Sequence, residues 1–197
     1  MSGRRHLPPE PARARSETAW RKLYRGERKA VALLVLLIPV LAVASIGNQQ
    51  IFNAYLIWGQ ANYDFNFAGF VVPTTWLVTL DSIVSVSFLF LAVAFWRWYG
   101  RHWQEPDELG KIAIGFLISV GGTAALAIGA GLADGHKVSL GYALAFHIIN
   151  SAGFANIFPV SLALYSRAAP RPVAATVIGV YYLFLFLSNA LVGWIGG

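Results

Sequence analysis

The stretch HIINSAGFANIFPVSLALYSRAAP, residues 147–170, is apolar enough for a membrane helix but contains His147, Asn150 and Asn156. An unpaired polar group in hydrocarbon costs several kcal/mol, so each of these side chains needs a partner or water. At 100° per residue, His147, Asn150 and Ser151 share one helix face, and Asn156 points roughly the opposite way. We expect the first face to line a solvated cavity and Asn156 to form an interhelical hydrogen bond.

The whole chain shares this apolar character. Of its 197 residues, 57% are hydrophobic and only 12% are charged, a balance that excludes a soluble globule of this size. Cysteine is absent from the sequence, which excludes disulfide bridges and thiolate metal sites. The sequence also lacks an H-E-x-x-H motif and a Gly-rich phosphate loop, so we expect no enzyme activity, no cofactor and no metal site.

Apolar segments of the length that crosses a bilayer recur along the chain. About 30 Å of hydrocarbon takes roughly 20 helical residues to cross. We predict an all-α integral membrane protein with a bundle over residues 29–197 and about five transmembrane helices, at 30–58, 73–98, 112–132, 139–166 and 173–194. We expect Pro39 to kink the first span rather than break it. In the third span, Gly121, Gly122 and Gly129 would allow close packing.

The basic residues are concentrated outside these spans. Residues 1–28 are rich in Pro and Arg and lack apolar periodicity, which predicts a largely disordered arm, and RSETAWRKLYRGERK (15–29) is compatible with a short helix on the membrane surface. Residues 1–29, the loop 97–111 and the turn 167–172 hold all but one of the 15 lysines and arginines. The positive-inside rule therefore predicts a cytoplasmic N-terminus in the inner (plasma) membrane. The net charge of +6 then indicates a membrane surface as the partner, rather than nucleic acid.

Two ionisable residues lie at similar depth in the second and fourth spans. Asp81 and His147 each stand about eight residues inside the outer end, or ~12 Å at 1.5 Å per residue. A charge there costs at least ~2.5 kcal/mol unless it is paired or hydrated, so an intramembrane acid is functional by default. A structural ion pair is the alternative for Asp81, and a neutral, fully hydrogen-bonded ring is the alternative for His147.

Amide side chains gather in the first span, in IGNQQIFN (46–53). Gln49 and Asn53 are spaced i, i+4 and therefore share a helix face. We expect Asn48, Gln49 and Asn53, together with Asn150 of the fourth span, to face the protein interior and contribute to substrate binding. The alternative is that such amides only join neighbouring helices.

An ordered set of motifs follows the arm. The stretch FAGFVVPTTWLVTLDS (67–82) has Gly-Phe, then Pro-x-x-Trp and an acidic residue. Later matches are Lys111 with Gly115, then Gly153, Pro159 and the run 167–170, and finally Gly179, Asn189 and Gly193. In this order the residues resemble the proton-dependent oligopeptide transporters (POT/PTR family) of the major facilitator superfamily, specifically helices seven to eleven of their C-terminal half.

This resemblance implies a twelve-helix carrier whose two six-helix halves move short peptides inward with protons and hold the substrate near the midplane. The chain would then be the C-terminal portion of a proton-coupled secondary transporter for small peptides or related polar metabolites. Its partners would be the lipid bilayer, a small peptide or polar metabolite with protons, and a missing N-terminal six-helix half. The alternative is a transport-inactive structural or regulatory subunit of the membrane, or a gene fragment.

Several family positions hold different residues here. The seventh-helix Glu-Gln pair of the family maps onto Asn48 and Gln49, and the tenth-helix Glu maps onto Phe154. The eighth-helix Asn that contacts substrate maps onto Asp81. We therefore hypothesise that the titratable site has moved to Asp81 and His147, since an imidazole beside a carboxylate can exchange protons near neutral pH.

Overall fold

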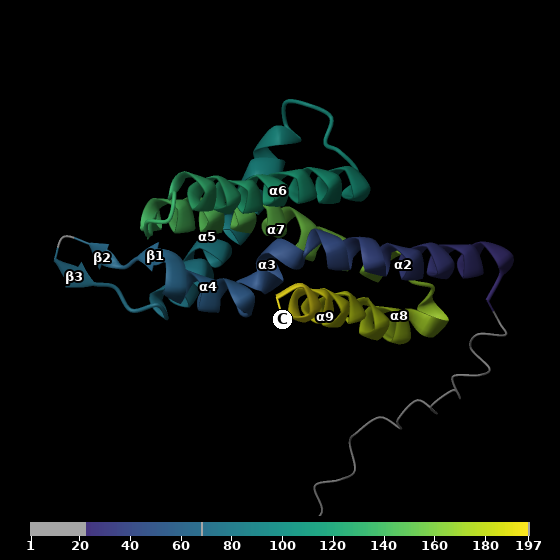
Figure 1. The fold of residues 1–197 in the computed structure, drawn as a ribbon. Coiled ribbons are helices and arrows are strands. Elements are labelled where there is room, and N and C mark those ends of the chain that lie inside the picture. The colour runs from purple at the N-terminus through teal and green to yellow at the C-terminus, as the bar shows by residue number, and fades with distance from the viewer. Residues whose placement is uncertain (1–22, 68, 197) are drawn as a thin grey trace, which may run out of the picture.

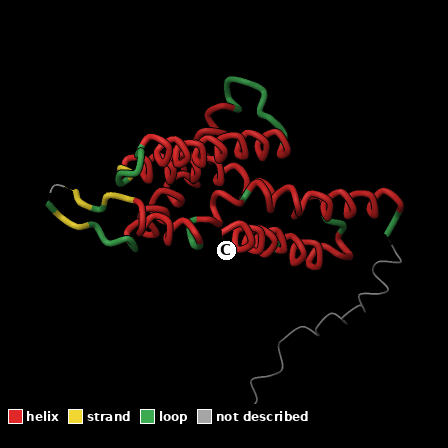
Figure 2. Tube along the Cα trace, viewed as in Figure 1, coloured by secondary structure: helices red, strands yellow, loops and turns green. Residues whose placement is uncertain are grey.

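The computed structural model describes residues 23–67 and 69–196 and is dominated by helices (Figures 1 and 2). The predicted arm lies outside the described residues up to residue 22, and α2 already begins at Arg25. The helical elements are α2 (Arg25–Ala44), α3 (Ile46–Gln50), α4 (Ala54–Asn62), α5 (Trp76–Tyr99), α6 (Glu108–Leu132), α7 (Leu140–Ala168), the 3₁₀ helix η1 (Arg171–Val173), α8 (Ala174–Tyr181) and α9 (Leu183–Gly196).

Short strands gather at one end of the bundle, on the left in Figure 1. β2 (Asn66–Phe67) pairs antiparallel with β3 (Phe70–Val71) in a small hairpin. β1 (Tyr63–Asp64) pairs parallel with β4 (Val138–Ser139) and so ties the end of α4 to the start of α7.

Four helices in the described part of the chain are long and apolar enough to cross a membrane. They are Trp76–Tyr99, Glu108–Leu132, Leu140–Ala168 and Arg171–Gly196, the last of which combines η1, α8 and α9. Large apolar side chains such as Leu89, Phe90 and Leu91 are exposed on α5, as expected for a surface in contact with lipid. The prediction of an all-α integral membrane protein is therefore confirmed.

The first predicted span differs from the expectation of one continuous helix. α2 runs through Pro39, but the helix ends at Ala44, with an interruption at Ser45, and a second interruption at residues 51–53 separates α3 from α4. Asn53 has backbone angles of φ −128° and ψ −123°, which are neither helical nor extended, and its side chain donates to the Gln49 carbonyl at 2.8 Å. Short polar side chains compete with helical hydrogen bonds in this way, which explains why the helix is interrupted in the polar segment and not at Pro39.

A seam of small residues joins α6 to α7. Gly115, Gly122 and Gly129 are buried at seven-residue intervals, close to two helical turns, and so share a face. A Cβ atom on Gly122 would lie 3.0 Å from the Asn150 backbone nitrogen, and one on Gly129 would lie 2.5 Å from the Tyr142 ring. The predicted close packing through Gly122 and Gly129 is confirmed, whereas Gly121 is exposed.

Candidate functional site

Asp81 lies in the first half of α5, on the face that packs against α7. Within α5 only Leu77 and Asp81 are buried, and they are spaced i, i+4. Asp81 retains only 4% of its accessible surface although it is acidic. A carboxylate in such a position requires a partner, and α7 provides one.

That partner is His147, which is fully buried in α7. Its Nδ1 lies 3.2 Å from Asp81 Oδ1, and its Nε2 lies 3.1 Å from the hydroxyl oxygen of Tyr55. Both ring nitrogens are therefore hydrogen-bonded, and three helices, α4, α5 and α7, meet at one imidazole. The expectation that Asp81 and His147 lie at the same depth is confirmed by their contact.

Tyr55 is the member of this group that the sequence patterns did not predict. It is the second residue of α4, which begins directly after the interruption at 51–53. Its ring packs against Phe146 at 5.1 Å and edge-on to His147 at 5.4 Å between ring centres. A tyrosine in an apolar segment is a weak signal by itself, and the turn that aims Tyr55 at His147 was not predicted.

The contact between α5 and α7 continues beyond the pair. Ser85 and Ser151, each one turn after Asp81 and His147, have hydroxyl oxygens 3.0 Å apart. Further along, the Trp96 indole donates to Asn156 Oδ1 at 2.6 Å, which confirms the predicted interhelical role of Asn156. Because residue numbers rise together in all three contacts, α5 and α7 run in the same direction.

Asn150 lies one turn beyond His147 and is also fully buried, but neither side-chain amide atom has a partner among the described residues. It packs against two glycines on other helices. A Cβ atom on Gly47 of α3 would lie 2.8 Å from Asn150 Oδ1, and one on Gly122 of α6 would lie 3.2 Å from Asn150 Cβ. Asn150 therefore lies where α3 packs against α7.

The amides of the first span form a separate group. Asn53 Nδ2 lies 3.3 Å from Asn189 Oδ1 on α9 and also donates to the Gln49 backbone carbonyl. The predicted helix face shared by Gln49 and Asn53 does not form, because the helix is interrupted at residues 51–53. Asn48 is buried in α3, and Gln49 is half-buried. The structure therefore brings Asp81 and His147 together but directs Asn53 toward α9.

The expectation of a wet face on α7 is wrong for this structure. His147 and Asn150 are fully buried, and Ser151 retains 1% of its surface. A cavity of about 450 Å³ is lined by Gln50, Tyr55 and residues of α6 and α9, but not by Asp81 or His147. Helix packing and Tyr55 exclude solvent from the Asp81–His147 pair. Sequence periodicity cannot predict this, because a polar helix face has the same sequence pattern whether it contacts water or another polar side chain.

Replacing Tyr55 by phenylalanine is expected to weaken the bundle slightly. The change removes the hydrogen bond to His147 Nε2 while keeping the ring, and interhelical hydrogen bonds in membranes contribute ~0.6 kcal/mol on average. The measurement is the free energy of unfolding in detergent. Tyr182→Phe, at an exposed tyrosine, is the matched control, and equal stabilities for the two variants would contradict the assigned contact.

The fold and the buried acid–imidazole pair together define a class: a multi-pass helical membrane protein with ionisable groups inside its bundle. The described residues contain no group of three or more His, Cys, Asp or Glu side chains that could hold a metal ion. No protein-family model matches this chain.

Two known proteins are similar to it. The peptide transporter YePEPT of Yersinia enterocolitica subsp. palearctica serotype O:3 (strain YE-P4) is 23% identical over 184 residues, which cover 91% of this chain and 36% of that protein. The crystal structure of an auto-inhibited POT family peptide transporter superposes with a TM-score of 0.64 at 17% identity, over 92% of this chain and 36% of that one.

Both comparisons agree with the resemblance drawn from the sequence motifs, so the resemblance to POT transporters is confirmed. The chain therefore shares the fold of the matching part of that POT family structure and spans about a third of the length of these relatives.

Proposed function

We propose that this chain is the C-terminal portion of a proton-coupled secondary transporter for small peptides or related polar metabolites, in the inner (plasma) membrane with its N-terminus cytoplasmic. The similarity to peptide transporters supports the substrate class. The observation that carries the proton coupling is the buried contact between His147 Nδ1 and Asp81 Oδ1 at 3.2 Å.

The proposed proton coupling follows from the change in net charge when the Asp81–His147 pair binds a proton. If Asp81 is ionised it can only accept hydrogen bonds, so His147 donates from Nδ1 and accepts at Nε2 from the Tyr55 hydroxyl. The pair then carries one negative charge in apolar surroundings, and one added proton neutralises it. Since a charge inside the membrane costs at least ~2.5 kcal/mol, we propose that proton binding and release accompany closing and opening of the contact between α5 and α7.

We assign the substrate contacts to four amide side chains. Asn48, Gln49 and Asn53 lie in and beside the short helix α3, between two helix interruptions, and Asn150 lies opposite α3 on α7. Amide side chains donate and accept at once, as peptide bonds do, so they match a peptide backbone. The opposite wall would come from a six-helix N-terminal half, which fits the 36% share of the relatives that this chain covers.

A second candidate is a transport-inactive structural or regulatory subunit. The observation that favours it is the burial of the Asp81–His147 contact, because an ion pair that only fastens α5 to α7 would look the same. Transport measurements separate the two candidates.

The experiment is peptide uptake into proteoliposomes that contain the tagged chain purified from its own host together with any polypeptide that accompanies it. We expect labelled dipeptides to accumulate when the inside is alkaline and to stop accumulating after a protonophore is added. Uptake that ignores the protonophore would contradict proton coupling, and absence of uptake from this assembly would favour the subunit.

A further inference from the structure

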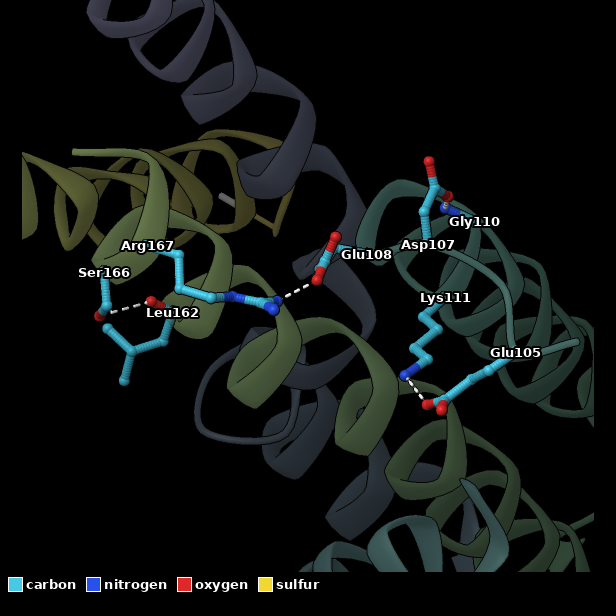
Figure 3. A network of polar contacts seen from close by, with 8 residues as sticks. All are labelled: Glu105, Asp107, Glu108, Gly110, Lys111, Leu162, Ser166 and Arg167. Carbon is cyan, nitrogen blue, oxygen red and sulfur yellow. Dashed lines mark hydrogen bonds and ion pairs between the residues drawn. The ribbon is translucent and has the colours of Figure 1, made fainter. Parts of the chain in front are cut away.

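A charged cavity of about 320 Å³ lies where α5 ends, α6 begins and α7 ends. Arg97, Lys111 and Arg167 line it together with Glu105 and Glu108. Figure 3 shows that Arg167 pairs with Glu108 and Lys111 pairs with Glu105. In the described part of the chain no carboxylate pairs with Arg97, so the cavity has one cation more than it has anions.

Aromatic side chains place this cavity at the level of the lipid headgroups. Trp98 and Trp103 have ring centres 5.4 Å apart, and Tyr99 packs against Trp103 at 5.2 Å. Tryptophan and tyrosine concentrate at the membrane–water interface, where an apolar ring and a polar group are both accommodated. The end of α5 therefore marks the boundary of the hydrocarbon.

An apolar groove of about 440 Å³ adjoins the charged cavity. Phe88, Leu91 and Ile118 are among the residues that line it, and Ala92 and Trp96 line both spaces. The Trp96 ring is fixed between them, because its indole donates to Asn156 and Lys111 Nζ lies 4.9 Å from the ring centre. The two spaces thus meet at Ala92 and Trp96.

We propose that the cavity and the groove together bind one anionic phospholipid, with the phosphate beside Arg97 and an acyl chain in the groove. A guanidinium offers paired donors to phosphate oxygens, and basic pockets between transmembrane helices bind anionic headgroups. The charged cavity alone fits any phosphate, and the adjoining apolar groove selects the lipid. The assignment does not depend on the proposed transport activity, because it rests on another part of the bundle.

The test compares three ligands on the delipidated full chain in detergent: phosphatidylglycerol, phosphatidylcholine with the same acyl chains, and inorganic phosphate. Native mass spectrometry gives the dissociation constants of the lipids, and competition with the bound lipid gives that of phosphate. We expect phosphatidylglycerol to bind at least about fivefold more tightly than phosphatidylcholine, the change that one cation produces near a membrane surface. Equal binding of the two lipids would overturn the proposal.

Arg97→Gln is expected to weaken phosphatidylglycerol binding about fivefold, and Arg97→Lys to restore most of it. The matched control is Arg101→Gln, which removes the same charge at the same end of α5 but does not line the cavity. If Arg97→Gln and Arg101→Gln behave alike, the charge acts only through the general surface potential, and the site is rejected.

Ala92→Phe separates a lipid site from a free-anion site. The larger side chain blocks the junction of cavity and groove, so we expect weaker phosphatidylglycerol binding and unchanged phosphate binding. Ala94→Phe, at an exposed position that lines neither space, controls for the added ring. Phosphatidylglycerol binding unchanged in Ala92→Phe would assign the cavity to a soluble anion and overturn the lipid proposal.

Discussion

Replacing Asp81 by asparagine is expected to abolish proton-driven peptide uptake while leaving the bundle folded. The amide keeps the size of the carboxylate and can still accept a hydrogen bond from His147 Nδ1, but it cannot bind and release a proton. Without that change of charge, opening and closing of the contact between α5 and α7 no longer depends on the proton gradient. The measurement is dipeptide accumulation in proteoliposomes with and without a pH gradient.

The matched control is Asp134→Asn. Asp134 is exposed in the turn after α6 and has a φ of 44°, a left-handed conformation that asparagine also adopts readily. We expect this variant to take up peptide as the parent protein does. Gradient-driven uptake that survives in Asp81→Asn would show that the carboxylate of Asp81 is not the coupling group.

Replacing Gly153 by alanine is expected to destabilise the bundle by about 2 kcal/mol, in the range of overpacked cores. The added Cβ would lie 2.5 Å from the Gly115 carbonyl oxygen and 2.7 Å from the Ser119 backbone nitrogen, and it would also clash with Ser119 Oγ. Backbone atoms of α6 cannot rotate away as a side chain can, so α6 and α7 must separate. Unfolding in detergent, followed by circular dichroism, measures the loss.

Gly179→Ala is expected to raise the stability of the bundle instead of lowering it. Gly179 lies in α8, and a Cβ atom added there would have no neighbouring atom within 4 Å, so the alanine meets open space. Alanine is favoured over glycine in a helix by up to ~1 kcal/mol, and we expect a small gain in stability. Equal effects of the two substitutions would mean that the seam between α6 and α7 is looser than described.

Several features of the fold were predictable from local sequence because they depend on length and depth alone. The spans that became α5, α6 and α7 follow from apolar length. The contact between Asp81 and His147 follows from counting residues inward from the same side of the membrane. The interhelical hydrogen bond of Asn156 was predicted, but its partner Trp96 lies on α5, the helix that His147 and Ser151 also contact, so helical periodicity did not identify the neighbouring helix.

What the sequence did not reveal depends on contacts between elements far apart in the chain. The interruptions at Ser45 and at residues 51–53 redirect Tyr55 toward His147 and Asn53 toward Asn189. Helix propensity alone indicates that the helix is less stable in this segment, but it does not give the positions of the interruptions. The burial of Asn150 against Gly47 and Gly122 likewise requires the packing of three helices.

The central claim is that Asp81 and His147 act as one proton-binding unit. The most direct measurement is the number of protons taken up by the purified chain over about pH 8 to 5, the range in which histidine changes charge, for Asp81→Asn, His147→Gln and the double variant. If the two residues share one proton, each single variant loses it and the double variant loses no more. Losses that add up in the double variant, or no loss in any variant, would contradict the account.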